Sequence, residues 1–451
     1  MNTKVMNPIE FKAARGSTLT GTLGTWLMVL ATVAMAVVIG VETLNTLFFD
    51  PYEDDYFLFR LAGSLADVEI GPLTYLMFGS LLVALMMGLP LTFVTGGLGV
   101  MFIYLVGDAT MLNIIPGRIF PMMTNSDLAA IPLFIFMASM LERAGLIEEM
   151  FNVVYKWMGG LSGGLATATI LASTILAAMV GVIGAAVVTM GIIALPAMLK
   201  RGYDHQIALG SIMAGGTLGI LIPPSILAIL YAVVAQQSVG ELYLGAIVPG
   251  LMLSGMYIAY VLIRTWLKPE MGPPVPVEER ISLKEKILLL KDLVAPLILV
   301  MLVLGLLFGG IATPVEAAGI GSFGAMLVAW KHGAFSVAAL KDASVTTAKA
   351  SAMVLWIMFG ASVFVGFYIL QGGQDFITET ILGTGLSAYG ILFMLMVLLV
   401  VLGMFLDWVG ILLLAVPIFI PIVQALEFDG LFGLPAVPGR TWCSGSACFT
   451  W

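Results

Sequence analysis

The residues from Gly215 to Ser225 read GGTLGILIPPS, and they interrupt an apolar run that extends from 207 to 235. An unbroken helix does not accommodate this stretch, because proline lacks a backbone donor and its ring clashes with the preceding turn. The carbonyl groups freed by the break then need other partners. A hard cation such as Na⁺ is one such partner, together with the hydroxyls of Thr217 and Ser225, since it prefers oxygen ligands. The alternative is a structural kink that neighbouring helices satisfy.

The composition predicts that this broken helix lies in a membrane. The chain has 451 residues, of which 60% are hydrophobic and 10% charged, and its mean hydropathy is +1.08. Spans of about 20 apolar residues cross a bilayer, whereas a soluble protein could not cover so much apolar surface with so few charges. The long runs lack the alternation of strands, so we expect an all-α polytopic membrane protein with about 11–12 hydrophobic segments. The runs cover 22–48, 73–94, 96–115, 128–141, 164–199, 207–235, 243–266, 293–311, 315–330, 350–370, 381–403 and 408–426.

The basic residues predict how the chain is oriented. A loop between the two halves of the chain carries six of them: Arg264, Lys268, Arg280, Lys284, Lys286 and Lys291. Lys and Arg stay preferentially on the cytoplasmic side of a membrane. We therefore expect the loop 264–292 and the basic N-terminal tail to be cytoplasmic, and the acidic segment 50–70 to lie on the opposite side.

The two halves share a weak internal similarity. Met179–Gly184 (MVGVIG) precedes Pro196 in the first half, and Met404–Gly410 (MFLDWVG) precedes Pro421 at the same Met-to-Pro spacing in the second. Paired segments interrupted by Gly and Pro are typical of transporters built from inverted repeats, whose ion and substrate sites lie near the bilayer midplane. The alternative is chance similarity in a glycine-rich apolar chain.

Two further features are candidates for ion binding. The glycines of Gly181–Gly191 could loosen a helix in which Thr189 is the only side-chain oxygen, although a plain small-residue packing face explains them equally well. Asp407 lies within an apolar stretch, where a carboxylate costs roughly 2.5–3.5 kcal/mol to insert. It is either an ion ligand or proton carrier, or it lies at a break between helices in contact with water.

Other polar features have structural explanations or exclude enzymes. Thr313-Pro314-Val315-Glu316 matches a capping box with Pro at the first helical position, so we predict that Glu316 caps a helix. The only two histidines, His205 and His332, cannot form an H-E-x-x-H zinc site, and the chain contains neither a P-loop nor a G-x-S-x-G motif. We expect no catalytic residue, no nucleic-acid partner, and an ion gradient rather than ATP as the energy source.

Several of these stretches resemble one family of transport proteins. GGTLGILIPPS, preceded by Leu195–Asp204 (LPAMLKRGYD), is similar to the large membrane permease subunit (DctM-like) of tripartite ATP-independent periplasmic (TRAP) transporters. Further similar stretches are Ile131–Phe136, Ala312–Gly319 and Gly403–Asp407, in the same order. The resemblance extends from about residue 72 to 427.

The resemblance implies a mechanism and its partners. It implies a bacterial inner-membrane importer of small organic acids, either 2-oxo acids and other monocarboxylates or C4-dicarboxylates. A periplasmic substrate-binding protein would deliver the substrate to this chain and a small four-helix membrane subunit. Sodium ions would drive an elevator motion of two inverted repeats with re-entrant hairpins. The candidate Na⁺ ligands are then Gly181, Gly184, Thr189, Gly216, Thr217, Pro223, Ser225 and Asp407.

The resemblance also divides the chain into parts. We expect an N-terminal tail with an extra transmembrane helix and an acidic periplasmic loop (1–71), followed by a first transporter repeat (72–266). A basic cytoplasmic linker (267–292) leads to a second repeat (293–428) and an atypical tail (429–451).

That tail and two other features depart from the family pattern. The tail holds Cys443 and Cys448 where the spacing of the first repeat places a second double proline near 448, so we expect a frameshift or truncation there. Many members carry Ser-Gly-Ser-Ser where this chain has Val180–Ile183, so backbone carbonyls and Thr189 would have to replace those hydroxyls. The single extra helix at 20–48 is too little to be a fused small subunit. The alternatives are a stand-alone sodium/anion symporter and a non-transporting, truncated membrane protein.

Overall fold

The computed structural model describes residues 68–107, 109–158, 160–180, 183–274, 283–428 and 437–438. The predicted N-terminal helix, Gly181, Cys443 and Cys448 lie outside these residues, as does most of the tail. Within the described part the chain is helical, as predicted, apart from a two-residue antiparallel pair of β1 (Glu427–Phe428) with β2 (Val437–Pro438).

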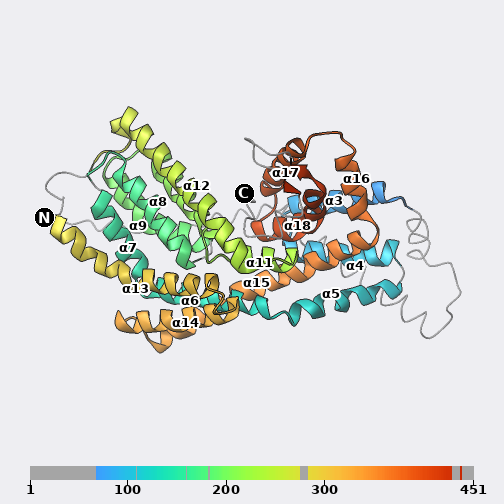
Figure 1. The fold of residues 1–451 in the computed structure, drawn as a ribbon, viewed down its shortest axis with the longest axis horizontal. Coiled ribbons are helices and arrows are strands. Elements are labelled where there is room, and N and C mark those ends of the chain that lie inside the picture. Colours follow the sequence, from blue (N-terminus) through green and yellow to red (C-terminus); the bar gives the residue numbers. More distant parts are fainter. Residues whose placement is uncertain are drawn as a thin grey trace, which may run out of the picture. The chain divides into compact units, whose positions relative to one another are not determined.

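Figure 1 shows the helices in their order along the chain. In chain order they are α3 (Ile70–Met86), α4 (Leu91–Val106), η1 (Ala109–Asn113), α5 (Ile114–Met123), η2 (Ser126–Ala129), α6 (Ala130–Arg143), α7 (Leu146–Met158), α8 (Gly164–Val180), α9 (Ile183–Lys200), α10 (His205–Thr217), η3 (Leu218–Ile220), α11 (Ile226–Ala235), α12 (Val239–Leu267), η4 (Pro269–Met271), α13 (Leu283–Phe308), α14 (Pro314–Lys331), α15 (Val337–Leu370), α16 (Gly373–Leu382), α17 (Ala388–Gly403) and α18 (Trp408–Ala425).

Few of these helices could cross a bilayer as single rods. Among the described residues, α12, α15 and α18 are long and apolar enough, and the segments 111–123 and 126–143 would form a fourth span bent by 60°. Shorter apolar stretches of 10–17 residues lie in α3, α4, α8, α9, α11, α13 and α17. Between α3 and α4, Gly and Pro end and start helices inside a run that hydropathy alone reads as continuous.

The first break lies elsewhere than the apolar pattern predicts. The predicted runs 73–94 and 96–115 would divide near residue 95, but α3 ends at Met86 and α4 begins at Leu91. Gly88 takes a left-handed φ of 81°, and Pro90 is the N-cap of α4. Glycine ends helices in this conformation and proline starts them. Leucines on both sides of Pro90 hide this break from a hydropathy profile.

The described chain divides into two compact units, and the first is built on close helix crossings. It comprises residues 68–107, 109–118, 359–376 and 401–406. A Cβ added to Gly99 of α4 would lie 3.1 Å from the backbone nitrogen of Phe364 in α15. The Thr74 hydroxyl lies 3.0 Å from the Tyr368 hydroxyl, and Phe78 makes an edge-on ring contact with Tyr368. Small residues at the crossing therefore let α4 and α15 touch through their backbones.

The second unit contains the broken helix and most of the other helices. It comprises the described residues of 119–358, 377–400 and 407 onward. Helix α6 lies along α14, where the Ser322 hydroxyl donates to the Leu133 carbonyl at 2.8 Å (Figure 1). Helix α8 packs against α10 and α12, and the hydroxyls of Thr174 and Ser254 lie 2.6 Å apart. Buried hydroxyls thus tie together helices that otherwise meet through apolar contacts.

One end of the second unit is joined by backbone hydrogen bonds. The Gly163 nitrogen donates to the Gly272 carbonyl at 2.8 Å, and the Asp204 nitrogen donates to the Met271 carbonyl at 3.0 Å. The Tyr203 hydroxyl accepts from the Leu165 nitrogen at 3.1 Å, and burial raises the pKa of this phenol. The turn between α9 and α10 is therefore fixed to the start of α8 and the end of α12.

The crossing in the first unit makes Gly360→Ala destabilising. A Cβ at Gly360 would lie 2.7 Å from the Thr92 carbonyl oxygen and 3.2 Å from the Gly96 nitrogen, and the backbone cannot yield cheaply. We expect a loss of about 1–3 kcal/mol in the free energy of unfolding, seen as a lower melting temperature of the purified chain. Gly97→Ala, on the partner helix α4 but with nothing within 4 Å of its Cβ position, is the control and should not lower the melting temperature. Equal melting temperatures would contradict the close packing.

Candidate functional site

The predicted break is present, but it starts later than expected. Helix α10 continues through Gly215 and Gly216 to Thr217, and the 3₁₀ turn η3 follows. Residues Leu221–Pro224 are not helical, and α11 begins at Ile226. The double proline therefore breaks the helix, whereas the two glycines do not.

The two glycines instead allow close helix packing. A Cβ on Gly215 would lie 2.7 Å from the Ser173 hydroxyl oxygen of α8, and a Cβ on Gly216 would overlap with the Val187 side chain of α9. Both glycines are buried. They let α8 and α9, the two arms of one hairpin, lie directly against α10. Gly216, one of the predicted ligands, therefore contributes to this segment by letting α9 pack closely on α10.

Ser225 closes the break as a helix cap. Its hydroxyl donates to the Ile220 carbonyl and lies 3.4 Å from the Ala228 nitrogen, which donates to it. Its carbonyl accepts from the hydroxyl of the fully buried Tyr243 at 3.1 Å, besides the Ile229 nitrogen. The Ser225 side chain is therefore held by its own segment, with both hydroxyl functions in use.

Three backbone oxygens of the break have no such partner. Ile222, Pro223 and Pro224 are buried, and no hydrogen bond among the described residues reaches their carbonyl oxygens. Buried carbonyl groups are paired in the great majority of cases. Pro223 is a predicted ligand, whereas Ile222 and Pro224 are not, and these three carbonyl groups are the ones at the break that lack a partner.

The other predicted ligands have different surroundings. Thr217 is exposed, and its hydroxyl donates to the Ala214 carbonyl at 2.7 Å. The Thr189 hydroxyl of α9 lies 3.4 Å from a carboxylate oxygen of Glu142, at the end of α6. Gly184 lies in the first turn of α9. Glu142 was missed as a neighbour of this hairpin, because its position at the end of an apolar run predicts only an interfacial residue.

Asp407 lies at the join between α17 and α18. Its carboxylate accepts from the Gly410 nitrogen at 3.2 Å, which makes it the N-cap of α18, and its side chain is exposed. This is the second of the two environments predicted for it, a break between helices. Helix α18 packs against α11, so the helix that Asp407 caps runs beside the one that follows the double proline.

The Met-to-Pro similarity corresponds to similar local structure. In each half one helix ends near the methionine, a second begins within a few residues, and the proline lies inside that second helix: Pro196 in α9 and Pro421 in α18. Helices α8 and α9 contact each other, and Ile391 of α17 shares a buried cluster with Ile422 of α18. Both segments are therefore helical hairpins.

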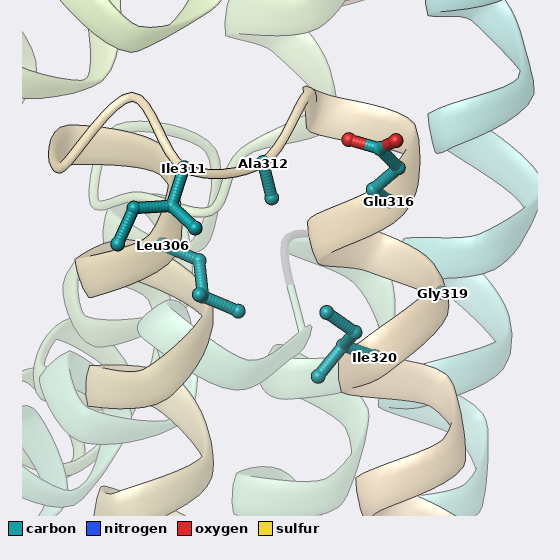
Figure 2. Close-up of a pocket in the computed structure, with 6 residues that line it drawn as sticks. All are labelled: Leu306, Ile311, Ala312, Glu316, Gly319 and Ile320. Carbon is teal, nitrogen blue, oxygen red and sulfur yellow. The ribbon is translucent and has the colours of Figure 1, made fainter.

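A pocket beside α14 contains the remaining predicted carboxylate. It has a volume of about 550 Å³ and is lined by Leu306, Ile311, Ala312, Glu316, Gly319 and Ile320 (Figure 2). The Glu316 carboxylate accepts from the Thr313 nitrogen at 2.8 Å, and the Thr313 hydroxyl caps the Glu316 nitrogen. The predicted capping box is confirmed. The pocket is otherwise apolar and offers no free ligand group.

Carboxylate clusters do not provide a metal site in the part that the structure describes. No three His, Cys, Asp or Glu side chains come together there.

Comparisons with known proteins agree on one family. Residues 78–434 match the family described as tripartite ATP-independent periplasmic transporter, DctM component. The isethionate TRAP transporter permease protein of Oleidesulfovibrio alaskensis is 31% identical over 81% of this chain, which spans only 57% of that relative. The C4-dicarboxylate large permease protein of Rhodobacter capsulatus is 30% identical over 80% of this chain and 84% of its own length. The ectoine/5-hydroxyectoine large permease protein of Ruegeria pomeroyi is 29% identical over 78% and 82%.

The capping role of Ser225 predicts the effect of its removal. Ser225→Ala leaves the Ala228 nitrogen without its cap and the Ile220 carbonyl without its donor. We expect a loss of about 1–2 kcal/mol in the free energy of unfolding, measured by thermal melting. Thr217→Ala, at an exposed hydroxyl of the same segment, should change melting little. A larger effect at Thr217 than at Ser225 would contradict the assignment of the cap.

Proposed function

This chain belongs to the DctM family, the large permease component of tripartite ATP-independent periplasmic transporters, and we propose that it imports small organic acids by coupling to sodium. Family membership makes it a membrane transport subunit rather than an enzyme. The sodium coupling and the substrate class are the proposal, and they rest on the broken helix α10–α11.

The observation that carries the sodium proposal is the set of buried carbonyl oxygens at Ile222, Pro223 and Pro224. Unwound backbone that lines a cavity is the usual source of Na⁺ ligands in transporters, because each oxygen offers a partial negative charge without a proton. Sodium loses its hydration shell on entering such a site, and several oxygens must replace it. The hairpin α8–α9 packs on α10 and limits what else can satisfy these groups.

The two hairpins support a transporter built from two repeats. The order α8, join, α9 recurs as α17, join, α18, and a short helix precedes each hairpin, α7 in the first half and α16 in the second. We propose that these segments are inverted copies, and that an elevator motion carries the ion and substrate together. The packing of α11 against α18 supports an arrangement in which the broken helix and the second hairpin act at one place.

The substrate and the partners follow from the family. The relatives named above transport C4-dicarboxylates, isethionate or ectoine according to their names, so the family alone does not name one substrate. We propose 2-oxo acids, other monocarboxylates or C4-dicarboxylates as the class. A small membrane subunit and a periplasmic binding protein complete the transporter, and thermal shifts of that binding protein would identify the acid.

The charge distribution supports one orientation in the inner membrane. Lys or Arg lies within or directly beside the helix joins α6–α7, α9–α10, α12–α13 and α14–α15, for example Arg143, Lys200, Lys268 and Lys331. The joins α11–α12 and α13–α14 carry none. Because basic residues stay on the cytoplasmic side, we propose that the first group of joins faces the cytoplasm.

Labelling of single cysteines tests this orientation. On a background in which Cys443 and Cys448 are replaced by Ser, Gln236→Cys should react with a membrane-impermeant maleimide in intact cells. Lys268→Cys should react only after the cells are permeabilised. Both positions are exposed, so the side of the membrane on which each lies decides whether the maleimide reaches it. The reverse pattern would contradict the proposed orientation.

Uptake into proteoliposomes tests the function. Liposomes containing this chain and the small subunit should accumulate a labelled organic acid only with the binding protein outside and an inward Na⁺ gradient. Replacing Na⁺ by K⁺ should abolish accumulation. Uptake without the binding protein would instead favour a stand-alone symporter, and no uptake under any condition would favour a non-transporting protein.

The double proline can be tested in the same assay. Replacing both Pro223 and Pro224 by Ala lets the helix close and use its own carbonyls, so we expect the Na⁺ concentration for half-maximal uptake to rise by at least roughly tenfold, about 1.4 kcal/mol. The matched control is Pro249→Ala, since Pro249 lies within the continuous helix α12. Its half-maximal concentration should stay close to that of the unaltered chain. Equal shifts of the half-maximal Na⁺ concentration in the two variants would contradict the proposal that the break is the ion site.

A further inference from the structure

The first compact unit contains a single basic residue among its described residues, Arg118. It lies in α5, between Pro116 and Pro121, and its neighbours in the chain include Ile114, Ile115 and Ile119. Helix α5 belongs to the bent pair that has the length and hydropathy of a membrane span. An ionisable side chain in such a segment is costly and points to a function.

Arg118 makes no ion pair or hydrogen bond among the described residues. Its five N–H donors are therefore not used to hold this unit together. The side chain is exposed, so a ligand can reach it. By contrast, Arg143 at the end of α6 in the second unit pairs with Asp342 at 3.5 Å and donates to Thr346 at 3.1 Å.

A glycine of α15 makes room for the guanidinium group. A Cβ added to Gly366 would lie 3.0 Å from Arg118 Nε and 3.4 Å from its Cδ. Gly366 is itself buried, and a Cβ there would shift the arginine side chain by a few tenths of an ångström. The backbone of α15 therefore forms the surface on which the arginine side chain lies.

A hydroxyl group lies on the same face of α15, one turn away. Ser362 precedes Gly366 by four residues, and residues with this spacing share a helix face, with about 6 Å between them. Its hydroxyl oxygen is buried and has no hydrogen-bond partner among the described residues. Thr74 and Thr95 of the same unit donate to carbonyls of their own helices, at Ile70 and Leu91, whereas Ser362 does not.

From this juxtaposition we propose that Arg118 and Ser362 form an oxyanion site that takes the carboxylate of the transported acid. A carboxylate has two oxygens, so it can accept from a guanidinium fork and from a hydroxyl at once. No other basic residue is present among the described residues of this unit, so the Arg118 guanidinium group is the position there that attracts an anion. This site rests on the proposed function for its ligand. A lipid phosphate shares the chemistry and is the other source of an oxyanion.

Chemical labelling of the full chain tests the site without requiring transport. The chain is placed in phosphatidylcholine nanodiscs and treated with phenylglyoxal, and labelling of each arginine is followed by mass spectrometry. Pyruvate or succinate at tens of millimolar should slow the labelling of Arg118 by roughly fivefold, as expected for a site of millimolar Kd. Succinamide, which carries no charge, should not. Arg264, an exposed arginine near the end of α12, is the internal control and should be labelled equally throughout.

Variants show whether the proposed geometry is responsible. Ser362→Ala and Gly366→Ala should each remove most of the protection by pyruvate or succinate. Ser80→Ala is the matched control in the same unit, since its hydroxyl already donates to the Met77 carbonyl at 2.9 Å, and it should retain the protection.

Three results would overturn the proposal. The first is the absence of protection by either acid, and the second is equal protection by the acid and the amide. The third is protection by phosphatidylglycerol nanodiscs with none by the acids, which would make lipid the ligand. Failure of uptake in proteoliposomes with intact protection of Arg118 would instead contradict the proposed function and leave the site in place.

Discussion

Backbone groups inside a bilayer have no water to bind, and this constraint governs the helix α10–α11. Each carbonyl released by Pro223 and Pro224 must find a partner within the protein or from a ligand. The chain satisfies some of them locally: Ser225 caps α11, its hydroxyl also serves the Ile220 carbonyl, and Tyr243 reaches the Ser225 carbonyl. The carbonyls of Ile222, Pro223 and Pro224 are left over. The double proline thus prevents a continuous helix here, and the buried Tyr243 stabilises the broken form by binding a carbonyl at the break.

The neighbouring elements are shaped to this break. Helix α10 continues through Gly215 and Gly216, and because these residues lack side chains, Ser173 and Val187 of the first hairpin pack directly against it. Helix α18, which Asp407 caps, packs on α11 from the second half of the chain. Family membership assigns transport to the chain. The helices packed around the break are the physical basis on which we propose sodium coupling.

Some of this could be predicted from residues alone, and some could not. Composition predicts a helical membrane protein, the double proline predicts the break, and Thr313-Pro314-Val315-Glu316 predicts its capping box, because each depends on local chemistry. The join at Gly88 and the packing roles of Gly215 and Gly216 depend on which helices meet, which no local pattern encodes. The same holds for Thr189, whose partner Glu142 lies on another helix, and for Arg118, whose importance appears only when the rest of its unit is found to lack basic residues.

We propose that the carbonyl groups of Ile222, Pro223 and Pro224 hold sodium. Hydrogen exchange of the purified chain in nanodiscs, compared in NaCl and in KCl at equal ionic strength, tests it most directly. Sodium bound there would fix the break and slow exchange in peptides covering Leu218–Leu230, while peptides from the α5–α6 bend would exchange equally in both salts. Identical exchange in Leu218–Leu230 in the two salts would contradict the claim.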